Sequence, residues 1–127
     1  MPVLAEEPLL HPDASKILTK SVLRAADKLG VSAAVLAGVL GVSQATVSRM
    51  KSGGYRLDAG KKEFELGVLF VRLFRSLDAI VGGDEPVARA WLANPNVALG
   101  GRPLEKIGAI SGLIDVIAYL DARRALV

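Results

Sequence analysis

The chain has 127 residues, enough for one domain or for two very small ones that share a core, and 51% of them are hydrophobic. It has no cysteine and one histidine, His11, which excludes disulfides, zinc–thiolate sites, multi-histidine metal sites and a histidine-dependent triad. The formal net charge of +3 is too small by itself to indicate a nucleic-acid partner. Because no nucleophile–base pair or phosphate loop is evident either, we expect no enzyme, no metal and no cofactor. The absence of cysteine fits a reducing compartment, so we expect a cytoplasmic protein.

The first 29 residues predict an arm followed by a helix. Pro2, Pro8 and Pro12 predict an extended arm over residues 1–14. A helix is predicted over residues 15–29, because apolar side chains recur there at helical spacing. Four basic side chains form a row at i, i+4 along the same helix: Lys16, Lys20, Arg24 and Lys28.

Small residues divide the next segment into two short helices. Ser32 is a good N-cap for a helix over about 33–40, Gly41 breaks it, and Ser43 caps a third helix that ends near residue 52. The truly apolar part of this uncharged stretch has ten residues, whereas a membrane span needs about 20. The N-terminus lacks the basic region and apolar core of a signal peptide. We therefore expect a soluble, unexported protein with no membrane contact.

The second half is also predicted to be helical. Over residues 61–81 the apolar stripe is broader than one half-exposed helix needs, which favours burial against two neighbours or against a second copy. Asp84 and Pro86 begin a helix to about residue 93, and a turn-rich connector leads to helices over about 103–109 and 112–124. No sustained period-two alternation occurs, so the predicted fold class is all-α.

A constrained pattern surrounds Gly41. Small Ala37 lets two helices approach, Gly41 supplies the left-handed backbone of a sharp turn, and Val42, Val47 and Met50 point back into the core. This is the spacing of a DNA-binding helix-turn-helix, whose second helix lies in the major groove. The segment VLAGVLGVSQATVSRMKSG resembles the Xre/Cro-type helix-turn-helix family. The alternative is a generic pair of core helices.

We expect the second helix of this unit and its exit to contact DNA. The expected DNA-binding residues are Ser43, Gln44, Ala45, Thr46, Ser48, Arg49, Lys51 and Arg56. Glutamine and arginine pair with base edges, alanine and threonine methyls contact thymine, and basic side chains hold phosphate. Residues 43–62 carry five basic side chains and one acidic, so the positive excess lies here, although a solvated helix face would look the same. Many family members have a phosphate-binding glutamine where this chain has Ala33, which is a reason to expect weaker DNA binding.

From residue 69 onward the chain resembles the toxin-binding domain of Xre/MbcA/ParS-type antitoxins through an ordered set of short elements. They are Arg72 to Leu77, Trp91-Leu92, Asn94 to Asn96, Leu99-Gly100-Gly101, Pro103-Leu104, Gly112-Leu113 and Tyr119 to Arg123. The expected organisation is an arm (1–14), a DNA-binding part (15–60) and a helical dimerisation and toxin-binding part (61–127).

The resemblance implies the antitoxin of a type II toxin–antitoxin system. Such antitoxins bind and block a RES-domain toxin that degrades NAD, and they repress their own operon. The toxin-binding residues that it implies are Trp91, Asn94, Leu99, Gly100, Tyr119, Asp121, Arg123, Arg124 and Val127. The implied partners are the RES-domain toxin and operator DNA. We also expect a second copy of the chain, paired through residues 61–81 so that two recognition helices lie about one DNA turn apart.

Simpler interpretations remain for several of these residues. Trp91 suits a core position better than a contact, and Arg123 and Arg124 suit an ordinary helix end, where cations favour the negative pole of the helix dipole. The alternative function for the whole chain is a free-standing transcriptional regulator that senses a ligand or partner through residues 64–127.

Overall fold

The computed structural model describes residues 13–126, so most of the predicted arm and the terminal Val127 lie outside the described residues. Seven helices and no strand make up the described part, in agreement with the all-α prediction. The helices are α1 (Ala14–Leu29), α2 (Ala33–Leu40), α3 (Gln44–Ser52), α4 (Lys62–Ile80), α5 (Glu85–Ala93), α6 (Pro103–Lys106) and α7 (Ile110–Arg124).

The ends of α2 and α3 are set by the residues that the sequence indicates. Ser32 and Ser43 each accept a hydrogen bond on Oγ from a backbone N–H three residues later, at 3.2 and 3.1 Å. Gly41 ends α2 in the left-handed conformation, with φ +69°. Among the described residues no single helix is long and apolar enough to cross a membrane, and α2 and α3 pass that test only as a pair bent by 105°.

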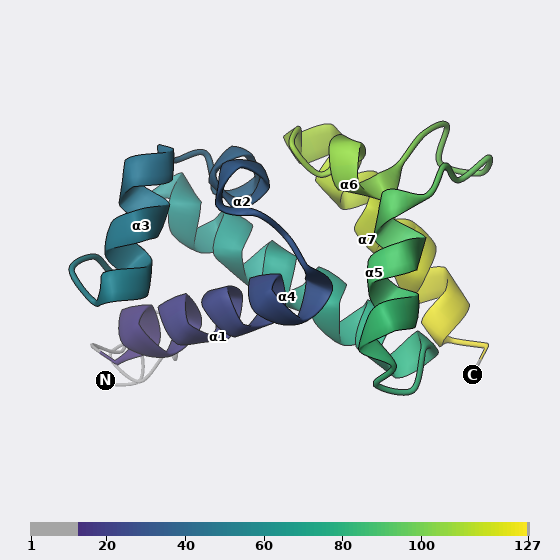
Figure 1. Cartoon of the computed structure of the whole chain (residues 1–127), viewed down its shortest axis with the longest axis horizontal. Helices are drawn as coiled ribbons and strands as arrows, with labels where there is room; N and C mark the ends of the chain where they lie inside the picture. The colour runs from purple at the N-terminus through teal and green to yellow at the C-terminus, as the bar shows by residue number, and fades with distance from the viewer. Residues whose placement is uncertain (1–12, 127) are drawn as a thin grey trace, which may run out of the picture.

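Helix α4 runs through the middle of the molecule (Figure 1) and packs against α1, α2 and α7. Its side chains Phe70, Leu73 and Leu77 are almost completely buried, and burial of each contributes about 1.5–3 kcal/mol. Neighbours within the same chain therefore cover much of the broad apolar stripe of this segment. One continuous core joins the two halves of the molecule through α4.

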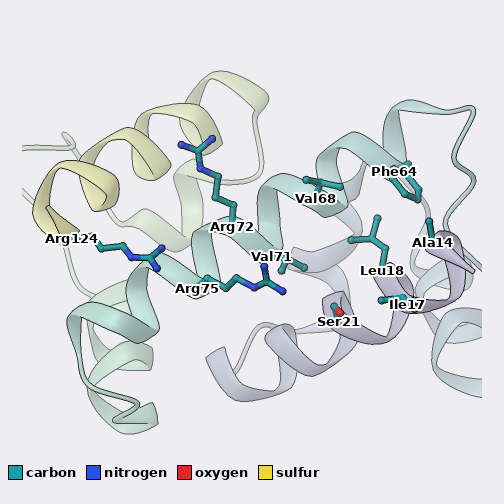
Figure 2. A pocket seen from close by; sticks show the side chains of 10 residues that line it. All are labelled: Ala14, Ile17, Leu18, Ser21, Phe64, Val68, Val71, Arg72, Arg75 and Arg124. Carbon is teal, nitrogen blue, oxygen red and sulfur yellow. The ribbon is translucent and has the colours of Figure 1, made fainter. Parts of the chain in front are cut away.

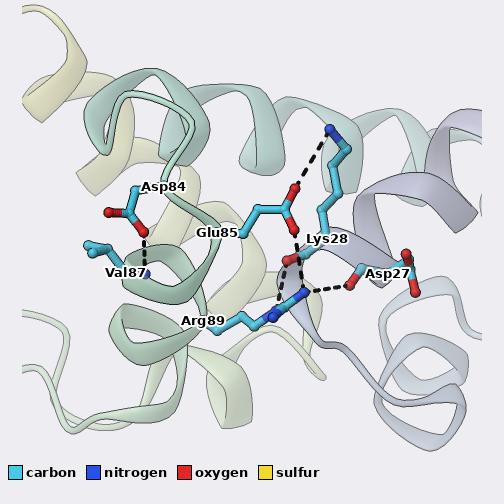
Figure 3. Close-up of polar contacts among 6 residues, drawn as sticks. All are labelled: Asp27, Lys28, Asp84, Glu85, Val87 and Arg89. Atoms are coloured by element: carbon cyan, nitrogen blue, oxygen red, sulfur yellow. Dashed lines mark hydrogen bonds and ion pairs between the residues drawn. The ribbon is translucent and has the colours of Figure 1, made fainter.

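Polar contacts also join the end of α1 to α5 (Figure 3). Arg89 Nε donates to the Lys28 carbonyl at 3.0 Å, and the Glu85 carboxylate lies 3.4 Å from Arg89 Nη2 and 3.9 Å from Lys28 Nζ. The ion pairs are partly exposed, so each contributes at most about 1 kcal/mol. The bond to the Lys28 carbonyl satisfies a backbone acceptor at the end of α1, which fixes where α5 lies.

The predicted boundaries of the last two helices were wrong by several residues. Helix α6 ends at Lys106 rather than 109, and α7 begins at Ile110 rather than 112. Gly112 lies inside the first turn of α7, where a Cβ would be 1.9 Å from the Lys106 carbonyl oxygen. Glycine therefore does not end a helix here; it lets α7 begin in direct contact with the backbone of α6.

Candidate functional site

Helices α2 and α3 form the turn that the sequence predicts. They meet at 105° around Gly41, and the neighbouring Ala37 is 5% exposed, which permits their close approach. Val47 is completely buried and Met50 is 3% exposed, so both side chains point inward as expected. The generic structural requirements of a helix-turn-helix are therefore met.

Most of the expected DNA-binding side chains lie on an exposed face. Those on or beside α3 that are exposed are Ser43, Gln44, Ala45, Ser48, Arg49 and Lys51, and Arg56 is exposed on the loop that follows. The prediction that Thr46 faces outward was wrong, because this residue is 9% exposed. Its hydroxyl lies 3.0 Å from Ser43 Oγ and accepts a hydrogen bond from Arg49 Nη2 at 3.0 Å. Thr46 thus orients the N-cap and Arg49.

At the start of α2 the chain has an alanine where the resemblance leads us to expect a phosphate-binding glutamine. Ala33 is its first residue and is half-buried, packed against the core. A methyl group cannot donate a hydrogen bond to a phosphate, so any anchoring at this corner has to come from other side chains.

A buried carboxylate organises the loop after α3. Glu63 is 8% exposed and accepts hydrogen bonds from the Tyr55 hydroxyl and from the backbone N–H of Asp58, the latter at 2.8 Å. The hydrogen bond to Glu63, followed by burial, raises the pKa of Tyr55 to about 12. On the same loop, Leu57 N donates to Thr19 Oγ1 at 2.9 Å, which ties the loop to α1. The exit of α3 is therefore held in place from two sides.

A second polar cluster lies where α7 meets α4. Asp121 accepts hydrogen bonds from Ser76 Oγ at 2.8 Å and from Arg72, and Arg124 Nη1 donates to Ser76 Oγ at 3.4 Å. The hydrogen bond from Ser76 is the main cause that lowers the pKa of Asp121, and Arg72 lowers it further. Of the expected toxin-binding residues, Asp121 and Arg124 are thus brought together on the side of α7 that faces α4.

Three other expected toxin-binding residues form a stack between α5 and α7. The rings of Trp91 and Tyr119 lie 6.1 Å apart between centroids at an angle of 21°, and the Arg123 guanidinium lies 5.1 Å from the Tyr119 ring centroid. Arg123 Nη2 also donates to Tyr119 Oη at 2.8 Å. Trp91 is half-buried against the core, so it has one packed side and one accessible side.

The remaining expected residues lie on the connector between α5 and α6. Asn94 is exposed at the end of α5, Leu99 is half-buried, and Gly100 is exposed with φ +74°. The backbone of Asn96 pairs with that of Gly101, and this is the only isolated β-bridge in residues 13–126. Val127 lies outside the described residues.

An apolar groove separates α1 from α4, with a volume of about 730 Å³ (Figure 2). Ile17 on α1 is 62% exposed in it, and Val68 on α4 is 37% exposed. Arg72, Arg75 and Arg124 lie at one end of the groove. The groove contains part of the apolar surface of α4 that its neighbours leave uncovered, including the side chain of Val68.

Comparison with protein families assigns both halves of the chain. The family model of the antitoxin Xre-like helix-turn-helix domain matches residues 8–72, and that of the antitoxin Xre/MbcA/ParS C-terminal toxin-binding domain matches residues 76–125. The chain belongs to the Xre/MbcA/ParS antitoxin family. No curated protein matches it. In this antitoxin the first match contains α2 and α3, and the second contains the stack of Trp91, Tyr119 and Arg123.

Sequence reasoning missed the residues that support the loop after α3 and the polar cluster between α4 and α7 in the antitoxin. Glu63 and Ser76 lie within a long apolar stripe and show no motif of their own. Thr19 accepts a hydrogen bond from the backbone N–H of Leu57, which lies 38 residues away in the sequence. The only available signal was the presence of polar side chains on the apolar side of a helix, which calls for a hydrogen-bond partner.

Proposed function

We propose that this antitoxin binds and blocks a RES-type toxin that degrades NAD, and that it represses its own operon by binding operator DNA. The observation that carries the proposal is the match of two antitoxin domains, in order, to nearly the whole chain. Residues 15–60 would serve DNA binding, and residues 61–127 dimerisation and toxin binding. The protein acts in this proposal as a binding protein that controls an enzyme's activity.

The exposed polar face of α3 supports the DNA-binding half of the proposal. Thr46 holds Arg49 at the exposed side of the helix through a hydrogen bond. Arg49 would therefore lose less conformational entropy on binding DNA than an unrestrained side chain would. We expect Arg49→Ala to weaken binding to the DNA upstream of the gene in gel-shift titrations at several salt concentrations. Arg24→Ala, on the exposed surface of α1, is the matched control and should bind as the wild type does. An unchanged affinity of Arg49→Ala would contradict the assignment of α3 as the recognition helix.

The end of α7 supports the toxin-binding half. Arg123 projects from an aromatic stack and Arg124 lies beside Ser76, so two guanidinium groups occur within the last turn of the helix. Guanidinium groups bind phosphate oxygens strongly, and NAD carries a pyrophosphate that the toxin's cleft must hold. This arrangement would let the antitoxin occupy or cover that cleft.

Purification with the neighbouring gene's product, followed by an NAD-consumption assay, tests this half. We expect a stable complex in which NAD consumption is suppressed, and recovery of NAD consumption with Arg123→Ala/Arg124→Ala. A truncation after Ala122 is preferable to one that removes residues 119–127, because Leu120 is 1% exposed and belongs to the core. A complex that stays intact and inhibited after that truncation would rule out the occupation of the toxin's cleft by the end of α7.

The proposal includes a homodimer. Val68 and Ile17 leave apolar surface exposed beside α4, and a second copy that covered it would place two recognition helices on one operator. Sedimentation analysis of Val68→Gln against wild type tests this interface: we expect the variant to dissociate at concentrations where the wild type is dimeric. If the variant dimerises as strongly as the wild type, the dimer interface does not include Val68.

The groove of about 730 Å³ also supports the alternative, a free-standing regulator that senses a ligand or partner. A groove with apolar walls and convergent arginines suits an amphipathic anion. The adjacent reading frame distinguishes the two functions, since a RES-domain toxin beside the gene favours the antitoxin and an unrelated operon favours the regulator.

A further inference from the structure

A cleft of about 390 Å³ separates the N-terminal half of α1 from the end of α3 and its loop. In Figure 1 the start of α1 lies beside the end of α3, at the N-terminal side of the molecule. Four of the lining residues are basic: Lys16, Lys20, Lys51 and Arg56. No acidic side chain of the described part of the chain lines it. The fold thus brings two basic segments together that are separate in the sequence.

Only the first half of the basic row on α1 belongs to this cleft. A helix turns by about 100° per residue, so members of an i, i+4 row drift by about 40° at each step. Lys16 and Lys20 line the cleft, whereas Arg24 does not, and Lys28 at the far end lies 3.9 Å from the Glu85 carboxylate on α5. The row therefore divides into a pair that faces α3 and a pair that does not.

The walls of the cleft are fixed by hydrogen bonds. Tyr55, which also lines it, donates to the buried Glu63 carboxylate. Thr19 Oγ1 accepts from Leu57 N at 2.9 Å and donates to the Ser15 carbonyl at 2.6 Å. These bonds hold the loop after α3 against α1, so the two basic segments stay on either side of the cleft. None of the four basic side chains has an ion-pair partner among residues 13–126.

We infer that this cleft binds backbone phosphates of the DNA strand that flanks the groove occupied by α3. The inference rests on the proposed DNA binding and extends the contact surface from α3 to α1. The cleft is lined by four basic side chains and by no acidic one among the described residues, and a surface of one sign attracts a polyanion. Lys16 and Lys20 lie one helical turn apart, about 6 Å, so they reach different oxygens of one strand. These lysines supply phosphate anchoring at the start of α1, whereas Ala33 begins α2 beyond the other end of that helix.

The test measures how the affinity for DNA depends on salt. Each phosphate contact contributes about 0.9 to the slope of log Kobs against log[salt], so Lys16→Gln/Lys20→Gln should lower its magnitude by about 1.8. The affinity deficit of the variant should then shrink about 12-fold between 50 and 200 mM salt. The probes are a labelled duplex from upstream of the gene and a scrambled duplex of equal length. Because backbone contacts carry no sequence information, both should weaken alike.

The matched control is Arg24→Gln/Arg102→Gln, which removes two positive charges from exposed positions outside the cleft. Circular dichroism melting shows whether each variant folds. We expect the control to retain the wild-type slope. Wild-type binding with an unchanged slope in Lys16→Gln/Lys20→Gln would overturn this inference alone, as would an equal change in the control. Absence of wild-type binding to either duplex would overturn the DNA-binding proposal and this inference with it.

Discussion

Replacement of Gly112 by alanine sets two effects against each other within the toxin-binding half. Gly112 lies in the first turn of α7, where alanine favours the helix by about 0.8–1 kcal/mol over glycine. The added Cβ would lie 1.9 Å from the Lys106 carbonyl oxygen and 2.7 Å from its carbon. The obstacle is backbone, so no side-chain rotation can relieve it.

The steric effect should win. Real Cβ atoms keep at least 3.0 Å from other heavy atoms, so α6 and α7 would have to separate by more than 1 Å. That movement would loosen the packing of Leu113 and Ile107, which are almost completely buried. Overpacking of this kind costs about 1–3 kcal/mol, and with the propensity gain subtracted we expect a net loss of about 1 kcal/mol. The melting temperature should fall by about 4 °C.

Urea unfolding followed by far-ultraviolet circular dichroism measures this loss. Gly108→Ala is the matched control, because its Cβ would meet only the Glu105 carbonyl oxygen at 3.6 Å, an ordinary contact. We expect the control to stay within about 0.5 kcal/mol of wild type. If Gly112→Ala is as stable as wild type or more stable, helix propensity outweighs the contact and the reasoning is refuted.

Three further predictions concern polar groups. Ser43→Ala removes the side-chain cap of α3 and should lower the free energy of unfolding by about 1 kcal/mol in urea titrations, so an unchanged midpoint would show that the cap contributes nothing. In a Tyr119→Phe background, ultraviolet titration should show Tyr55 ionising at about pH 12, and Glu63→Gln should move this pKa toward 10; no movement would contradict the hydrogen bond. Because the folded-state pKa of Asp121 is lowered, its ionised form stabilises the folded state above its unfolded pKa, and this contribution is lost as the pH falls through the folded value. Asp121→Asn should therefore be less stable than wild type at neutral pH, with a gap that closes in acid; equal stability at pH 7 would contradict this.

The helices of the first half were predictable because their ends depend on local residues. Ser32 and Ser43 cap helices through bonds to N–H groups three residues away, and Gly41 ends a helix through its own backbone conformation. None of these features needs a distant partner. The separation of each helix into an exposed and a buried face could be predicted for the same reason, since helical periodicity determines which side chains share a face.

The errors and omissions involve contacts between distant residues. The start of α7 was misplaced because Gly112 acts through a contact with α6, which no local rule describes. Thr46 was placed outside because its spacing fits the exposed face, yet the residue is 9% exposed and its hydroxyl is engaged by Ser43 and Arg49. Asp121 meets Ser76 across 45 residues, and Lys16 joins Lys51 only through the packing of α1 against α3. The DNA and toxin contacts themselves remain predictions.

The two family matches meet between residues 72 and 76, inside the continuous helix α4. Arg72 and Ser76, one on each side of that junction, both bind Asp121. Because α4 is one rigid helix, the number of residues in it sets both the rotation and the distance between the two matched domains. One inserted residue would rotate one half against the other by about 100° and translate it by about 1.5 Å. A chimaera that joins halves from two relatives should therefore tolerate substitutions in α4 far better than insertions or deletions there. To fold and function, it must keep the number of residues in α4 unchanged.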